Sequence, residues 1–279
     1  MLLHKWCWNT SELIPTTGKE YEFSSTDEIK TLGIAWKART DCFTFKVKVE
    51  QNAHPTKRLV LSIISRLFYP LGLLGPVITR AKVFMQQLWL LKIDWSERLP
   101  AKEACEWQEF VKSLMILNGI NIERCIVIQS PVVTELHGFC DASEKAYGAA
   151  VYTRTVTSAG EVRVKLVASK SRVSPIKQVT IPRLESCRRR SHQINAQSIK
   201  NGYYISLYWT DSMIVISWMK KESRDLKTFV TNRVVIIQEF TEMNRWHHVP
   251  SVSGLPDQNS KIRPNLLKNK AKLTEKFIC

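Results

Sequence analysis

Carboxylates occur in this sequence where strand-like runs end or helices begin, which is where side chains can gather around a metal ion. Asp141 follows the apolar run 135–140, Glu185 lies at a helix-start pattern, Asp211 follows the run 207–210, and Asp257 comes later. Mg²⁺ binds where several oxygen ligands meet at one point, and two such ions can activate a water molecule that attacks a phosphodiester. One hypothesis is therefore metal-dependent phosphodiester hydrolysis.

The same positions also suit a purely structural role. Asp211 is followed directly by Ser212, and Ser143 lies two residues after Asp141. Aspartate and serine are common where helices and turns begin, because their side chains accept hydrogen bonds from nearby backbone N–H groups. Spacing alone leaves both interpretations open.

The second half of the chain has the pattern of a mixed sheet. Runs rich in Val, Tyr and Phe predict three successive antiparallel strands over 134–141, 148–155 and 161–169. Two further strands are expected over 205–210 and 244–249, with helices over 212–220 and 227–241. Strands followed by alternating helices and strands indicate an α/β fold, with a five-stranded mixed sheet flanked by helices.

The first half is predicted to be a helical and hairpin region. Alternating runs at 31–36 and 42–50 surround a polar turn and indicate a hairpin. Apolar residues at helical spacing then predict helices over 56–68, 76–91 and 101–117. Tryptophans within apolar runs, such as Trp89 and Trp209, are expected in the core and not at a base-stacking site.

The chain carries a large excess of positive charge. Its 279 residues include 41 Lys and Arg against 25 Asp and Glu, a formal net charge of +16. This excess favours a polyanionic partner, with nucleic acid as the first candidate. Between residues 154 and 200, eleven basic residues accompany only Glu161 and Glu185. The alternative is a solvated basic surface that keeps the protein soluble.

Sequence features of secreted, membrane or zinc-binding proteins are absent. The seven cysteines show no zinc-ligand spacing, no apolar leader follows Met1, and prolines and glycines interrupt the apolar run 67–78. We therefore predict an intracellular protein of the cytoplasm or nucleus, with reduced thiols and no membrane association.

Six segments resemble, in the same order, the polyprotein of Bel/Pao retrotransposons. They are His137-Gly-Phe-Cys-Asp-Ala-Ser-Glu-Lys-Ala-Tyr-Gly-Ala-Ala-Val-Tyr152, Ser169-Lys-Ser-Arg-Val-Ser-Pro175, Thr180-Ile-Pro-Arg-Leu-Glu185, Trp209-Thr-Asp-Ser212, Phe229-Val-Thr-Asn-Arg-Val234 and Trp246-His-His-Val-Pro250. Upstream, Lys30-Thr-Leu-Gly-Ile-Ala-Trp36 and Phe68-Tyr-Pro-Leu-Gly-Leu-Leu-Gly-Pro-Val-Ile78 resemble the stretch that joins the reverse transcriptase palm to ribonuclease H.

The resemblance implies three regions. Residues 1–125 would be a thumb/connection-like region, 130–262 a ribonuclease H-like domain, and 263–279 a basic, weakly ordered tail. No YxDD-like polymerase motif is present. Any DNA synthesis would then need palm and fingers supplied by another chain.

The resemblance also implies an activity and its residues. The family domain removes the RNA strand of RNA–DNA hybrids during reverse transcription, using two Mg²⁺ ions, with Mn²⁺ as a possible substitute. Asp141, Glu185 and Asp211 match the metal ligands, and Asp257 matches a fourth if Gly254-Leu-Pro-Asp257 replaces the family's Asn-Pro-Ala-Asp. Hybrid phosphates would be bound by three basic residues, Lys170, Arg172 and Arg183. His248 is expected to be an ordinary strand residue, the alternative being a role in product release.

One segment departs from the family pattern. Three consecutive arginines, 188–190, follow Glu185 where the family has an apolar helix that packs on the sheet. Burying an unpaired charge there would cost several kcal/mol. The alternative hypothesis is therefore a catalytically inactive retroelement remnant that at most binds nucleic acid.

Overall fold

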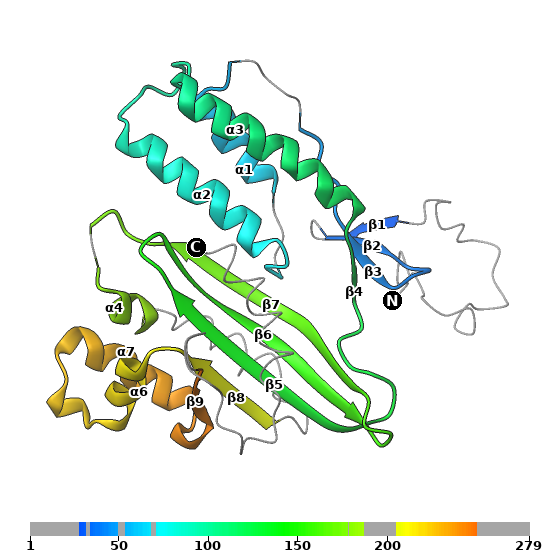
Figure 1. Cartoon of the computed structure of the whole chain (residues 1–279), viewed down its shortest axis with the longest axis vertical. Coiled ribbons are helices and arrows are strands. Elements are labelled where there is room, and N and C mark those ends of the chain that lie inside the picture. Colours follow the sequence, from blue (N-terminus) through cyan, green and yellow to red (C-terminus); the bar gives the residue numbers. More distant parts are fainter. Residues whose placement is uncertain are drawn as a thin grey trace, which may run out of the picture. The chain divides into compact units, whose positions relative to one another are not determined.

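The structure is a computed structural model that describes residues 28–31, 34–49, 54–67, 71–177, 179–186 and 205–249 (Figure 1). Its contacts divide the chain into two compact units. The first unit is drawn from residues 1–70 and 88–125, and the second from 71–87 and 126–279. Residues 71–87 therefore belong with the unit that carries the candidate site, although they precede the boundary expected from the sequence.

The first unit contains a four-stranded antiparallel sheet in the order β1-β2-β3-β4. Its strands are β1 (Glu28–Thr31), β2 (Ile34–Lys37), β3 (Cys42–Thr44) and β4 (Asn121–Glu123). The predicted hairpin is present as β2 and β3, but the strand expected over 42–50 ends at Thr44. Arg124 closes the hairpin turn, because its Nε lies 2.5 Å from Asp41 Oδ1.

Two amphipathic helices of the first unit bury one side each. In α1 (Lys57–Arg66), Thr56 Oγ1 accepts from the Leu59 N–H at 3.3 Å, and the buried residues are Lys57, Val60, Ile63 and Ile64. Helix α3 (Ala101–Leu114) buries Trp107, Phe110, Val111 and Leu114, and a 3₁₀ turn, Met115–Gly119, follows it.

Trp89 differs from the sequence prediction, because its side chain is 50% exposed and not in the core. Its ring instead covers a buried cation: Lys57 Nζ lies 4.1 Å from the Trp89 ring centroid and 5.3 Å from that of Trp95. The ammonium group also donates to the Ile93 carbonyl at 3.2 Å. A lysine can stay buried when aromatic faces and a carbonyl replace its water.

The second unit contains the predicted five-stranded mixed sheet, in the order β7-β6-β5-β8-β9 (Figure 1). β5, β6 and β7 are antiparallel, whereas β8 pairs parallel to β5 and β9 parallel to β8. The strands are β5 (Pro131–Ala142), β6 (Ala146–Thr157), β7 (Val162–Val173), β8 (Ile205–Thr210) and β9 (Trp246–His248). The first three are longer than predicted, so Lys170 and Arg172 lie within β7.

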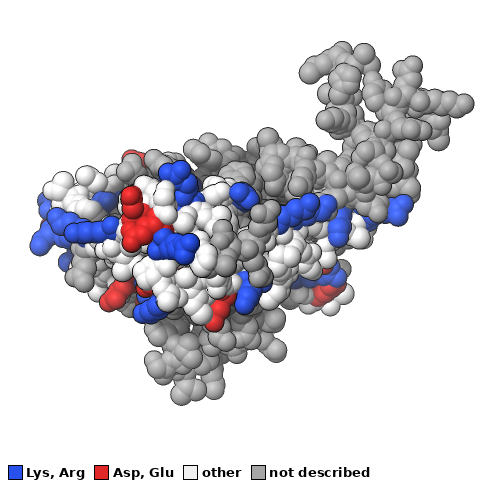
Figure 2. Space-filling model, turned by 90° about the horizontal axis from the view of Figure 1, so that it is seen from above, with Lys and Arg blue, Asp and Glu red and all other residues white. Residues whose placement is uncertain are grey.

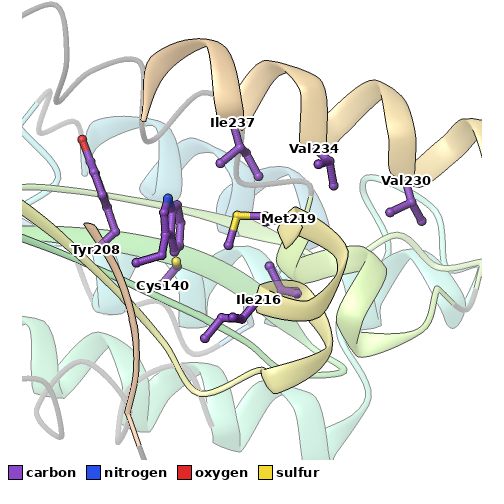
Figure 3. Packing of buried hydrophobic residues seen from close by; sticks show 9 residues of the cluster. Cys140, Tyr208, Ile216, Met219, Val230, Val234 and Ile237 are labelled. Carbon is purple, nitrogen blue, oxygen red and sulfur yellow. The ribbon is translucent and has the colours of Figure 1, made fainter. Parts of the chain in front are cut away.

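Helices pack against one face of this sheet. They are α4 (Ile181–Ser186), α6 (Met213–Lys220) and α7 (Thr228–Phe240), with short 3₁₀ turns at Ser223–Asp225 and Met243–Arg245. A core cluster joins α6 and α7 to the strands (Figure 3), and its buried members are Cys140, Tyr208, Val215, Ile216, Met219, Val230, Val234, Ile237 and Trp246. Alternation along β5 puts Cys140 on this helix-covered face and its neighbour Asp141 on the other.

The loop 71–74 and the start of α2 (Gly75–Leu90) are bonded to β7, an edge strand. The Ser169 N–H donates to the Leu71 carbonyl at 3.1 Å, and Ser169 Oγ donates to the Gly72 carbonyl at 2.6 Å. Thr79 and Ser171 are bonded through their hydroxyl groups. Gly72 has φ +71°, and a Cβ there would lie 1.7 Å from the Ser169 carbonyl oxygen. Glycine is therefore required for this approach.

Candidate functional site

Asp141 and Asp211 lie beside each other at the ends of adjacent parallel strands. In the β5–β8 pairing Cys140 is opposite Thr210, so the two aspartates occupy the next position on each strand. Asp141 is half-buried and Asp211 is exposed. On the other side of β5, the residue opposite Asp141 is Gly148, which places no side chain next to the carboxylate.

Neither aspartate serves as a helix cap. Ser212 is the N-cap of α6, and its side chain accepts from the Val215 N–H at 3.4 Å. The Ser212 N–H in turn donates to Thr210 Oγ1 at 3.2 Å. Asp141 lies inside β5, and the turn that follows is closed by Ser143, whose N–H donates to the Ala146 carbonyl at 2.8 Å. Ser212, and not Asp211, therefore caps α6, and Asp141 precedes no described helix.

Glu185 belongs to α4, which contacts β5, α6 and α7. Leu184, only 2% exposed, anchors this short helix in the unit. The structure thus places the backbone of Glu185 on a helix packed against the strand that carries Asp141, while its side chain lies outside what is described. Asp257 and the arginines 188–190 also lie outside the described residues.

An aromatic row crosses the sheet directly before the two aspartates. Phe139, Trp209 and His247 are register partners on β5, β8 and β9. The Phe139 and Trp209 ring centroids are 6.2 Å apart at 12°, and those of Trp209 and His247 are 4.9 Å apart at 36°. Phe139 shares its face of β5 with Asp141, because the two are two residues apart. All three rings are half-buried.

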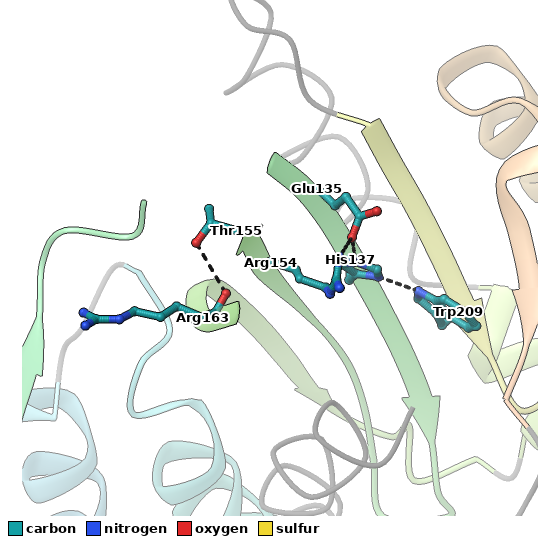
Figure 4. Close-up of polar contacts among 6 residues, drawn as sticks. All are labelled: Glu135, His137, Arg154, Thr155, Arg163 and Trp209. Carbon is teal, nitrogen blue, oxygen red and sulfur yellow. Dashed lines mark hydrogen bonds and ion pairs between the residues drawn. The ribbon is translucent and has the colours of Figure 1, made fainter. Parts of the chain in front are cut away.

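A buried histidine next to this row links β5 to β8, and its partner Glu135 is bonded to Arg154 of β6 (Figure 4). Trp209 Nε1 donates to His137 Nδ1 at 3.0 Å, so the His137 proton lies on Nε2, which is 3.2 Å from Glu135 Oε2. Arg154 Nη1 donates to the same carboxylate oxygen at 2.7 Å. Burial lowers the pKa of His137 below 6.5, and the opposing effect of Glu135 is smaller. His137 is therefore a neutral link between β5 and β8.

His248 lies in β9, as predicted, and is also next to an aspartate of the site. Its Nε2 is 3.1 Å from the Asp211 carbonyl oxygen, and the Val249 N–H donates to the Thr210 carbonyl at 2.9 Å. Because a carbonyl can only accept, His248 donates this bond. These contacts fix the backbone of Asp211.

The predicted phosphate-binding residues are exposed but lie on two elements. Lys170 and Arg172 alternate along β7 with Ser169 and Ser171, so the cations point away from the side bonded to α2. Arg183 is on α4. Figure 2 shows Lys and Arg side chains on one face of the molecule in separated groups, with acidic residues among some of them.

Two of the basic residues counted in the sequence are held by acidic neighbours. Arg154 is bonded to Glu135, and Arg163 Nε lies 2.8 Å from Glu161 Oε1. The excess of positive charge between residues 154 and 200 is therefore a weaker indication of phosphate binding than the bare count suggests. Lys170, Arg172 and Arg183 carry that hypothesis.

Within the described residues, no group of three or more His, Cys, Asp and Glu side chains could hold a metal ion. The candidate ligands Asp141, Asp211 and Glu185 are all carboxylates, so a site formed by them would offer only oxygen donors. Such donors fit Mg²⁺ or Mn²⁺ in preference to zinc or copper. No described helix has the length and apolar character needed to cross a membrane.

The sequence matches a family model described as the Pao retrotransposon-like RNaseH-like domain over residues 56–212, more than half of the chain. The chain belongs to this family. The match includes Asp141, Glu185 and Asp211 and stops before Asp257. The match also begins at Thr56, the N-cap residue of α1, so the Pao domain extends beyond the five-stranded sheet.

Comparison with solved structures gives remote similarities for this Pao-family chain. A foamy viral protease-reverse transcriptase in complex with double-stranded DNA is 15% identical, with a TM-score of 0.45, covering 82% of this chain and 38% of that one. Ribonuclease H1 from Halobacterium salinarum is 17% identical, with a TM-score of 0.26, covering 43% and 88%. LC11 ribonuclease H1 in complex with an RNA/DNA hybrid is 12% identical, with a TM-score of 0.25, covering 42% and 85%.

The Pao-family chain thus spans less than half of the foamy viral chain that it matches. No curated protein matches it.

Proposed function

We propose that this Pao-family chain hydrolyses the RNA strand of RNA–DNA hybrids during reverse transcription. The observation that carries the proposal is the β5–β8 register, which sets Asp141 and Asp211 side by side at the end of the sheet. The packing of α4 against β5 adds a third acidic residue, Glu185, on an adjacent element. Membership of the Pao family supports the same class of reaction.

Asp141, Glu185 and Asp211 would hold two Mg²⁺ ions or their Mn²⁺ substitutes, and we include Asp257 as a fourth candidate ligand. When bound, the metal pair would supply an activated water and neutralise charge on the scissile phosphodiester. The half-buried position of Asp141 limits its mobility, and the bond from His248 holds the backbone at Asp211. Pre-organised ligands of this kind are what an in-line displacement requires.

Other parts of the chain have assigned roles in this proposal. Lys170, Arg172 and Arg183 bind phosphates of the hybrid, because guanidinium and ammonium groups are the usual phosphate partners in proteins. Residues 1–125 act as a thumb/connection-like region, 130–262 as the ribonuclease H-like domain and 263–279 as a basic tail. A reverse transcriptase palm/fingers chain is a candidate partner in this proposal, and the reaction takes place in the cytoplasm or nucleus.

The test is cleavage of a labelled RNA–DNA hybrid by the full chain with Mg²⁺ or Mn²⁺. Asp141→Asn and Asp211→Asn should each lower the rate by more than ~100-fold, since even the outer-shell partners of metal ligands are worth roughly 10- to 100-fold. Asp225→Asn is the matched control, because Asp225 is exposed on the 3₁₀ turn that follows α6 and has no proposed role in the site.

Two outcomes would contradict the proposal. Cleavage that survives Asp141→Asn and Asp211→Asn would show that other groups, or a contaminating nuclease, perform it. A folded chain that binds the hybrid and never cuts it would support the alternative function, a nucleic-acid-binding remnant, for which the arginines after Glu185 are the sequence evidence.

A further inference from the structure

Two arginines from different helices converge on one aromatic ring. The guanidinium carbon of Arg233, on α7, lies 3.4 Å from the centroid of the Phe229 ring, and that of Arg183, on α4, lies 5.2 Å from it. The two guanidinium carbons are therefore separated by no more than the sum of these two distances. Two guanidinium groups on one ring bring several N–H donors and two positive charges near one point, which is an arrangement that suits a phosphate.

The ring holds the arginines in a way that suits phosphate binding. An arginine that stacks on an aromatic ring contacts the ring through the face of its guanidinium group. Its five N–H donors lie in the guanidinium plane and not on that face. Arg233 is further fixed because its Nη1 donates to the Phe229 carbonyl at 2.7 Å. Phe229 itself packs against the core cluster of the second unit, which makes the ring a fixed support. Pre-positioned guanidinium groups lose less freedom when they bind a phosphate.

We infer that Arg183 and Arg233, supported by Phe229, form a binding site for phosphate groups of the nucleic acid. The inference rests on the proposed function, and it adds Arg233 and Phe229 to the binding surface. Arg183 lies two residues before Glu185 on α4, so this site is on the same helix as a proposed metal ligand. A strand bound there would be held against the helix that also carries Glu185.

The test measures binding of a fluorescent RNA–DNA hybrid to the full chain without divalent metal, over roughly 50 to 200 mM salt. Arg183→Gln and Arg233→Gln should each weaken binding about tenfold, as expected for lost hydrogen bonds to a charged group. Each should also make the slope of log affinity against log salt shallower by about one. The double variant should lose less than the product of the two single losses, because the arginines share one ligand.

Three further variants separate phosphate binding from a structural role. Arg163→Gln removes the same charge at an exposed position of β7 that is paired with Glu161, and should leave the slope nearly unchanged. Phe229→Leu keeps an apolar side chain but removes the aromatic ring, and should weaken binding while both arginines are present. Arg233→Lys keeps the charge, so it should restore most of the salt slope but not the full affinity.

The outcomes distinguish this inference from the proposed function. Folded Arg183 and Arg233 variants that bind with the affinity and slope of the unmodified chain would overturn the inference while leaving hybrid cleavage intact. Arginine-dependent binding by a chain that never cuts would instead reject the hydrolytic function and keep the site. A chain that does not bind the hybrid would overturn both.

Discussion

Gly72→Ala is the substitution that best tests the attachment of α2 to the second unit. Gly72 has φ +71°, and an alanine Cβ would lie 1.7 Å from the Ser169 carbonyl oxygen. Gly160 offers a matched control, because its φ is +79° but nothing lies within 4 Å of a Cβ there. The left-handed backbone conformation should lower the free energy of unfolding of both variants by about 1 to 2 kcal/mol. For Gly160→Ala we expect no further loss.

At Gly72 two more costs apply. The atom in the way is backbone, so it cannot rotate aside, and relief of the overlap should cost about 1 to 3 kcal/mol. Separation of the loop from β7 would also break the bonds from Ser169 to the Leu71 and Gly72 carbonyls, worth about 1 kcal/mol each. We therefore expect Gly72→Ala to lower the free energy of unfolding by about 3 to 5 kcal/mol more than Gly160→Ala.

The assay is urea unfolding of the full chain, combined with hydrogen exchange of residues 71–87 and of β7. Gly72→Ala should speed exchange in both segments, since the loop satisfies a backbone donor on the edge of the sheet. Gly160→Ala should leave both segments protected. Equal loss of stability in the two variants, within about 0.5 kcal/mol, would refute the claim that the close approach to Ser169 requires a glycine.

Three other predictions follow from single contacts. Ser212→Ala should lower the free energy of unfolding by about 1 kcal/mol through loss of the α6 cap, whereas Asp211→Ala should not, as urea titration of both variants would show. Met219→Ala should cost about 2 to 5 kcal/mol because Met219 is 1% exposed within the core cluster, and a loss below 1 kcal/mol would contradict that packing. Because the pKa of His137 is lowered in the folded protein, the unfolded chain takes up a proton at this histidine more readily than the folded chain does. The free energy of unfolding should therefore fall as the pH drops below about 6.5. In urea unfolding midpoints measured from about pH 8 to pH 5.5, His137→Gln should reduce this pH dependence.

The sequence predicted the elements of the second unit because their patterns are local. Runs rich in Val, Tyr and Phe mark β5, β6 and β7, and the five-stranded mixed sheet follows from the order of strands and helices. The same patterns placed Asp141 and Asp211 at strand ends. That they are neighbours depends on the parallel pairing of β5 with β8, which spacing along the chain does not specify.

Features that depend on partners distant in sequence were missed. β1 and β4 are short strands of 4 and 3 residues, and β4 pairs with β3 across most of the first unit. Lys57 was not predicted to be buried, because its aromatic neighbours Trp89 and Trp95 are more than thirty residues away. The attachment of residues 71–87 relies on serines of β7 that no local pattern marks as partners.

The bond between His137 and Trp209 explains how the candidate site keeps its register. β5 and β8 are neighbours in the sheet, but along the chain β6, β7 and α4 lie between them among the described elements, so no tight turn fixes their alignment. A slip of two residues would keep every side chain on its own face yet move Asp211 away from Asp141 by about 6.6 Å, the rise of two strand residues. Such a slip would also break the 3.0 Å bond from Trp209 to His137, in a place where a buried imidazole could find no water. The neutral histidine therefore stabilises the one alignment in which the two carboxylates lie side by side.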